Sequence, residues 1–179
     1  MSPSAERDPL TPPTCAPDLV AALAATGQTV ASAESLTAGL FAATLAGVPG
    51  ASAVLRGGVI VYATELKAQL AGVPQEVLDR DGPVAPTTAR ALAAGVRERC
   101  AATWGIGLTG VAGPDPQDGR PVGTVYIGIA GPEGTDVVEL AAQGDRWAIR
   151  SGTTRRALSE LLDRVRGQGG ADADLEPPG

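Results

Sequence analysis

Hydrophobic and polar positions along this chain switch repeatedly between a helical and an extended spacing. Segments in which apolar residues recur three and four positions apart are separated by short apolar runs bounded by glycine, proline and polar residues. This pattern predicts strands over 28–33, 53–62, 104–110, 122–130 and 135–143, and helices over 18–27, 35–47, 64–72, 86–103 and 145–166.

Residues at the ends of these segments support the boundaries. Asp18 and Asp145 are favoured N-cap residues, and Pro86 suits the first turn of a helix. Gly27 follows the first predicted helix and is expected to end it. The apolar run 53–62, interrupted by two glycines, is interpreted as a buried strand.

Helices interleaved with strands predict a sheet that carries helices on both faces. The turn GPEG joins the last two strands, so we expect an antiparallel hairpin that makes the sheet mixed. We therefore predict an α/β fold, a single-domain three-layer α/β/α sandwich over residues 18–166. The segments 1–17 and 167–179 hold few large apolar residues and are predicted to be disordered tails.

The composition limits the classes of function. A chain of 179 residues with 44% hydrophobic residues fits one globular domain. Its net charge of −6 and the lack of a polybasic run argue against nucleic-acid and anionic-membrane partners. No segment approaches the roughly 20 apolar residues that a bilayer span requires. The N-terminus has no apolar signal region, so we expect a cytoplasmic protein.

Histidine is absent, which removes the commonest general base and the usual zinc ligand. Cys15 and Cys100 are too few for a disulfide framework or a four-thiolate metal site. We therefore expect chemistry that runs without imidazole, with no metal and no organic cofactor.

Ser35 falls where the strand 28–33 is predicted to give way to a helix. Free backbone N–H groups and the helix dipole at such a turn can stabilise an oxyanion, which favours a nucleophile there. Serine is equally a favoured helix N-cap, and sequence position alone does not separate the two interpretations.

Lys67 is the only lysine in a chain with 13 arginines, and it can lose its proton at modest cost when it is desolvated. Tyr62 lies five residues earlier, so the two side chains can converge across a strand-to-helix turn and relay protons for Ser35. Taken singly, Lys67 is as easily a solvated lysine, and Tyr62 a strand-end aromatic residue with its hydroxyl in water.

The glycine-rich segment 107–123 follows a predicted strand and suits close backbone approach to a phosphate or carboxylate. It matches neither the P-loop nor the dinucleotide fingerprint, and an ordinary loop explains it as well. Arg146 and Arg150, four positions apart on one helix, can clamp a phosphate, although such arginines are usually solvated or ion-paired.

Several motifs, taken together and in order, resemble the C-terminal domain family of the competence-damage-inducible protein CinA. The resemblance runs from about Val20 to Arg166 and rests on AESLTAG, GGVIVYATELK, LAGVP, DGPVA, GLTGVAGP, PVGTVYIGIA and GDR. Stand-alone members of that family are nicotinamide-nucleotide amidohydrolases. The resemblance therefore implies deamidation of nicotinamide mononucleotide to nicotinic acid mononucleotide and ammonia.

The resemblance also implies roles for individual residues. Ser35, Tyr62 and Lys67 match the family's catalytic set. The pocket-lining and substrate-binding positions match Thr109, Gly110, Gly113 and Arg146. By the same analogy the partner is a small nucleotide, and we expect a homo-oligomer, a dimer or larger.

One residue departs from the family pattern, because the serine motif commonly ends in two glycines and this chain has Ala38 before Gly39. We expect the extra methyl group to tighten the pocket. Two other functions stay open: a Ser/Lys amidase acting on another small amide or a lactam-like ring, and a non-catalytic nucleotide-binding or regulatory module.

Overall fold

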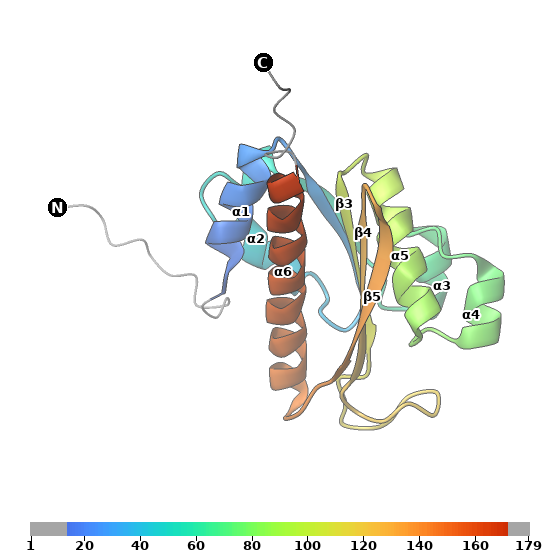
Figure 1. The fold of residues 1–179 in the computed structure, drawn as a ribbon. Helices are drawn as coiled ribbons and strands as arrows, with labels where there is room; N and C mark the ends of the chain where they lie inside the picture. The colour runs from blue at the N-terminus through green and yellow to red at the C-terminus, as the bar shows by residue number, and fades with distance from the viewer. Residues whose placement is uncertain (1–13, 172–179) are drawn as a thin grey trace, which may run out of the picture.

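The computed structural model describes residues 14–171, in which a five-stranded sheet lies between two layers of helices (Figure 1). The strand order is β2-β1-β3-β4-β5; β2 and β3 run parallel to β1, and β4 is antiparallel to both β3 and β5. The strands are β1 (Val30–Glu34), β2 (Leu55–Ile60), β3 (Trp104–Gly110), β4 (Thr124–Gly131) and β5 (Gly134–Ala141). The predicted α/β sandwich, the mixed sheet and the closing hairpin are confirmed.

Each face of the sheet is covered by its own helices and its own apolar cluster (Figure 1). One layer holds α1 (Ala16–Ala25), α2 (Leu40–Ala46) and α6 (Arg146–Ala171). The other holds α3 (Thr64–Gln69), α4 (Gln75–Asp81) and α5 (Pro86–Arg99). A short 3₁₀ turn, η1 (Ala51–Ala53), precedes β2.

The helix α5 lies directly on the backbone of the central strands. A methyl group at Gly107 of β3 would lie 2.5 Å from the Ala89 carbonyl oxygen, and one at Gly128 of β4 would also meet that oxygen. Contacts this short are closer than side-chain carbon atoms tolerate. The glycines therefore allow α5 to pack close to the sheet. With only 3% aromatic residues, the chain fills this part of its interior by close backbone packing rather than with large side chains.

Several boundaries differ from those predicted from the sequence. The strand β2 is not buried, because it forms the edge of the sheet and its residues alternate between exposed and partly covered. The helix α4 was not predicted, and α2 begins at Leu40 rather than at Ser35. Asp145 is confirmed as an N-cap, since its carboxylate accepts a hydrogen bond from the Ala148 N–H at 2.8 Å.

The ends of the domain also differ from the prediction. The helix α1 begins at Ala16, with Asp18 in its first turn rather than at its cap, and α6 continues to Ala171. Residues 1–13 and 172–179, which make up most of the two predicted tails, lie outside the described residues. None of the helices within residues 14–171 combines the length with the hydrophobicity that a bilayer span requires.

The direction of the strands gathers the candidate residues at one edge of the sheet. The parallel strands β1, β2 and β3 end there, and the hairpin returns the chain to the same edge before α6 begins. Ser35, Tyr62 and the loop after Thr109 follow these strand ends, and Arg146 opens α6.

Ala38 lies in the left-handed region, with φ = +50°, and its side chain is exposed. This conformation costs an L-residue about 1–2 kcal/mol, and a glycine at the same position avoids that cost. Glycine also loses more conformational entropy on folding, which offsets part of the gain. We expect Ala38→Gly to raise the free energy of unfolding by about 0.5–1 kcal/mol, as measured by urea denaturation.

A matched control is Ala94→Gly, at an exposed position inside α5, which we expect to lower the free energy of unfolding by about 1 kcal/mol. Equal losses of stability in the two variants would show that Ala38 is not strained.

Candidate active site

A buried hydrogen bond joins Lys67 to Ser35. The Lys67 Nζ donates to Ser35 Oγ at 3.1 Å and to the Val61 carbonyl oxygen at 2.9 Å. Ser35 follows β1, whereas Lys67 lies on α3, the short helix after β2. Because β1 and β2 are neighbouring parallel strands, the segments that follow them meet at the same sheet edge.

The environment of Lys67 changes its acidity. Its side chain is only 2% exposed, and burial lowers its pKa to about 8, with the carboxylate of Glu65 opposing the shift. An amine with this pKa is neutral in a substantial fraction of molecules at mildly alkaline pH, so it can accept a proton from Ser35. The alternative of a solvated lysine is wrong.

Ser35 does not cap a helix. The N-cap of α2 is Gly39, and the Ser35 N–H donates to the Leu108 carbonyl oxygen of β3 at 2.9 Å. The hydroxyl is thus free of a capping role and lies 3.1 Å from an amine, in the place expected of a nucleophile.

The cap of α2 is instead supplied by Glu34, a residue that the sequence analysis did not single out. Its carboxylate is 1% exposed and accepts hydrogen bonds from the N–H groups of Gly39, Phe41 and Ala42 at 2.9–3.1 Å, and from Ser32 Oγ at 3.0 Å. A carboxylate in the AES motif was a visible signal, but nothing in the sequence showed that its side chain turns inward.

Arg146 and Arg150 do not form a common phosphate clamp. The Arg150 guanidinium donates to the carbonyl oxygens of Leu36 and Thr37 at 2.8 and 3.0 Å. The Arg150 Cζ atom lies 6.0 Å from the centroid of the Trp147 ring. Neither interpretation of Arg150 drawn from the sequence, a phosphate ligand or a solvated or ion-paired arginine, includes these backbone partners, because no sequence pattern reveals them.

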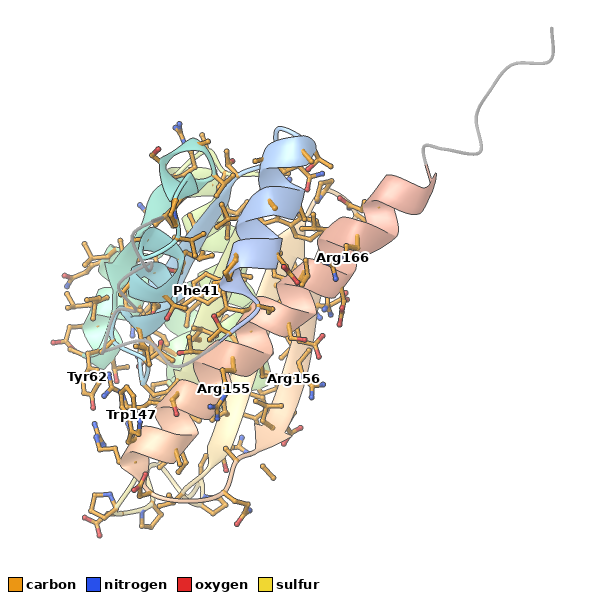
Figure 2. All side chains as sticks on the ribbon, turned by 90° about the vertical axis from the view of Figure 1, so that its left-hand side faces the viewer. Phe41, Tyr62, Trp147, Arg155, Arg156 and Arg166 are labelled. Atoms are coloured by element: carbon orange, nitrogen blue, oxygen red, sulfur yellow. The ribbon has the colours of Figure 1, made fainter. Side chains whose placement is uncertain are left out.

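Tyr62 and Arg146 lie together at the rim of the site. Arg146 donates to Tyr62 Oη and to the Gly113 carbonyl oxygen, both at 2.6 Å. Tyr62 is 55% exposed, and Figure 2 shows it beside Trp147 at the end of the molecule where α6 begins. Among the described residues, no hydrogen bond joins Tyr62 to Ser35 or Lys67, so the structure does not bring the phenol into direct contact with the other two.

The end of β3 and the loop that follows it form the opposite wall. Thr109 is fully buried and donates its hydroxyl proton to the Pro83 carbonyl oxygen at 2.7 Å, which holds the DGPVA segment against β3. Gly110 and Gly113 border the same pocket, as do Asp115 and Gln117, which the sequence analysis did not single out.

These residues enclose a pocket of about 130 Å³. All seven residues identified from the sequence border it: Ser35, Tyr62, Lys67, Thr109, Gly110, Gly113 and Arg146. Among the described residues, no three acidic or cysteine side chains lie close enough together to hold a metal ion.

Residues 14–165 match the family described as the CinA C-terminal domain. The chain belongs to this family. A CinA-like protein from Frankia casuarinae is 51% identical over 138 residues, which cover 77% of this chain and 31% of that protein. A putative competence-damage inducible protein from Geobacillus sp. (strain WCH70) is 52% identical over 139 residues, covering 77% of this chain and 33% of its own length. The chain spans about a third of the length of these relatives.

Solved structures of the CinA superfamily share the fold. A CinA superfamily protein from Klebsiella pneumoniae 700603 matches with a TM-score of 0.82 and 26% identity, over 85% of this chain and 96% of that one. The competence/damage inducible protein CihA from Agrobacterium tumefaciens matches with a TM-score of 0.79 and 32% identity, over 86% and 97% of the two chains.

Ala38, the departure from the CinA-family serine motif, does not line the pocket. Its side chain is exposed and is not among the pocket-lining residues, so the expectation that its methyl group tightens the pocket is wrong. The methyl group instead sits on a residue with positive φ, where its effect is on the stability of the turn.

The lowered pKa of Lys67 predicts how stability depends on pH. Between pH 8 and pH 10.5 the unfolded chain keeps the lysine proton while the folded chain has released it, so the free energy of unfolding rises across this window. Relative to Lys67→Met, we expect the wild-type protein to gain up to about 3 kcal/mol over that range, from urea denaturation at a series of pH values.

The matched comparison cancels the contributions of tyrosine and cysteine groups, which both proteins share. Parallel pH profiles for wild-type protein and Lys67→Met would contradict the lowered pKa.

Proposed function

We propose that this chain hydrolyses the carboxamide of nicotinamide mononucleotide, giving nicotinic acid mononucleotide and ammonia. The observation that carries the proposal is the buried hydrogen bond of 3.1 Å between Lys67 Nζ and Ser35 Oγ at the wall of a pocket. A serine beside a desolvated amine is an activated nucleophile that needs no histidine. Membership of the CinA C-terminal domain family supports this reaction, because its stand-alone members are nicotinamide-nucleotide amidohydrolases.

The reaction begins with neutral Lys67 accepting the Ser35 proton while the serine oxygen attacks the carboxamide carbon. A bond forms between Ser35 Oγ and that carbon, and the carbonyl electron pair moves onto oxygen. The intermediate then collapses and the C–N bond breaks. The nitrogen leaves as ammonia with the proton that Lys67 took from Ser35, passed directly or through Tyr62, so Lys67 and Tyr62 return to their starting protonation states. Water then attacks the ester carbon while Lys67 accepts one of its protons. The bond between that carbon and Ser35 Oγ breaks as Lys67 returns the proton to Ser35, which leaves the carboxylate.

Only some of the backbone N–H groups after Ser35 are available to hold an oxyanion. The N–H groups of Gly39, Phe41 and Ala42 at the start of α2 already donate to Glu34, so they are not available to a substrate. Leu36 lines the pocket, and its N–H donates no hydrogen bond to any residue that the structure describes. We assign the Leu36 N–H as an oxyanion donor, adjacent to the nucleophile.

Tyr62 is assigned to the proton relay through its own hydroxyl proton. The phenol oxygen accepts a hydrogen bond from Arg146, and this leaves its O–H free to donate into the pocket. A phenol held in this way can protonate the departing nitrogen as the C–N bond breaks.

The pocket size favours a substrate that is only partly enclosed. A volume of about 130 Å³ is well below the roughly 300–1,000 Å³ of pockets that enclose drug-sized ligands. We propose that the pyridine carboxamide enters the pocket while the ribose phosphate lies outside, within reach of Arg146. This side chain is exposed and forms no ion pair with a carboxylate of the described residues.

The decisive experiment measures release of ammonia and nicotinic acid mononucleotide from nicotinamide mononucleotide by the purified, folded protein. We expect Ser35→Ala and Lys67→Ala each to lower kcat by at least about 10³-fold, and Tyr62→Phe by about 10²-fold. The control Tyr126→Phe, at a tyrosine outside the pocket, should retain the wild-type rate.

Nicotinamide riboside and unrelated small amides tested alongside would separate this reaction from that of a general amidase. A folded wild-type protein that binds the nucleotide without turnover would instead identify a non-catalytic binding module.

A further inference from the structure

We propose that Arg150 is a positioning residue that fixes the turn carrying Ser35 and the Leu36 N–H. The inference rests on the proposed function, because it concerns the same nucleophile. It assigns to Arg150 a task at the backbone of the turn rather than at the substrate.

Two hydrogen bonds tie Arg150 to the turn. Nε donates to the Leu36 carbonyl oxygen at 2.8 Å, and Nη2 donates to the Thr37 carbonyl oxygen at 3.0 Å. These two oxygens are 114 and 113 positions away in the chain, so α6 reaches across to hold a segment that follows β1. Two parallel N–H donors on one rigid guanidinium fix the orientation of both carbonyl groups.

The turn needs this support because its own conformation is costly. Ala38 has φ = +50°, in the left-handed region that is costly for an L-residue, whereas Gly39, at +93°, adopts positive φ without strain. Within the turn, only the bonds from the Ala38 N–H to the Ser35 oxygen, at 3.0 Å, and from the Leu40 N–H to the Thr37 oxygen, at 3.2 Å, close the backbone on itself.

Charged groups hold the segment at both ends. The Glu34 carboxylate accepts from N–H groups where α2 begins, and the Arg150 guanidinium donates to carbonyl groups just after Ser35. The strained turn between them is therefore held by a fixed anion and a fixed cation.

Orientation of the turn matters for the reaction itself. The Leu36 carbonyl that accepts from Arg150 belongs to the residue directly after Ser35. Movement of this part of the backbone would therefore displace the Ser35 hydroxyl from Lys67, its hydrogen-bond partner. A displacement of about 1 Å at a reacting group can cost about 100-fold in rate.

Arg150 differs from Arg146 in access to substrate. Arg146 borders the pocket, whereas Arg150 is partly buried, is not among the pocket-lining residues and donates from two of its three nitrogens to the backbone. Loss of Arg150 should therefore lower kcat with little change in KM. Loss of Arg146 should raise KM and also lower kcat, because Arg146 holds Tyr62 as well as facing the substrate.

The test compares Arg150→Ala and Arg150→Lys with Arg155→Ala, a control on an exposed face of α6 (Figure 2). Arg155 forms no hydrogen bond or ion pair with any described residue, so its loss removes a charge without removing a contact. For nicotinamide mononucleotide we expect Arg150→Ala to lower kcat by about 100-fold with KM within about threefold, and added guanidinium ion to restore part of the rate.

A second readout is independent of the substrate. The rate at which phenylmethylsulfonyl fluoride modifies Ser35, followed by mass spectrometry, should fall at least about tenfold in Arg150→Ala and stay unchanged in Arg155→Ala. If Arg150→Ala fails to fold, Arg150→Lys, which keeps the charge but loses the paired donors, carries the same test with a smaller expected loss.

The outcomes separate the two proposals. A wild-type protein that does not release ammonia, yet shows the expected loss of Ser35 modification in the Arg150 variants, would overturn the amidohydrolase function and leave the positioning role standing. Folded Arg150 variants with the wild-type kcat and modification rate would overturn the positioning role, whatever the substrate.

Discussion

The hydrogen bond between the Lys67 amine and the Ser35 hydroxyl joins residues 32 positions apart and ties the segment after β1 to the segment after β2. Removing an amine from water costs free energy, and here no carboxylate bonds to it in return. The Val61 carbonyl oxygen and the Ser35 hydroxyl are its only hydrogen-bond partners among the described residues. The price is a lowered pKa, which is the property that a base acting without histidine requires.

The surrounding fold keeps this pair from separating. Val61, Ala71 and Val73 bury the start and end of the α3 segment in the apolar cluster beneath α5, so α3 cannot move toward solvent without exposing them. On the other side of the sheet edge, α6 reaches the turn after Ser35 through Arg150. The nucleophile and its base are thus anchored from opposite layers of the sandwich.

Much of the fold follows from local sequence pattern. The strand β3 spans the predicted residues 104–110, and the hairpin and the Asp145 cap were also predicted, because alternation, turn residues and caps act over a few positions. The edge position of β2 was not predictable in this way. Its apolar run is typical of a buried strand, and only the order of strands in the folded sheet shows that one side has no neighbour.

The candidate site, like the fold, could be predicted only in part from the sequence. The single lysine and the absence of histidine indicated Ser35 and Lys67 as the nucleophile and its base. The family motifs indicated the residues that line the pocket. The inward turn of Glu34, the bond from Arg146 to Tyr62 and the backbone contacts of Arg150 depend on long-range packing. No spacing between these residues encodes such contacts, so Glu34 was not identified from the sequence and neither interpretation of Arg150 included its backbone partners.

The two ends of the hairpin formed by β4 and β5 differ in how well they tolerate inserted residues. Its ladder pairs Thr124 with Ala141 at the site edge and Gly131 with Gly134 at the far tip. Equal numbers of residues added to both strands at the tip would lengthen the hairpin there and leave the start of α6 in place. A single residue added between Ala141 and Arg146 would shift Arg146 relative to Tyr62 at the rim of the site. It would also shift Arg150 relative to the turn after Ser35. Length variation among homologous chains should therefore accumulate at the tip, and the tip is the place to graft a peptide tag or a second binding module.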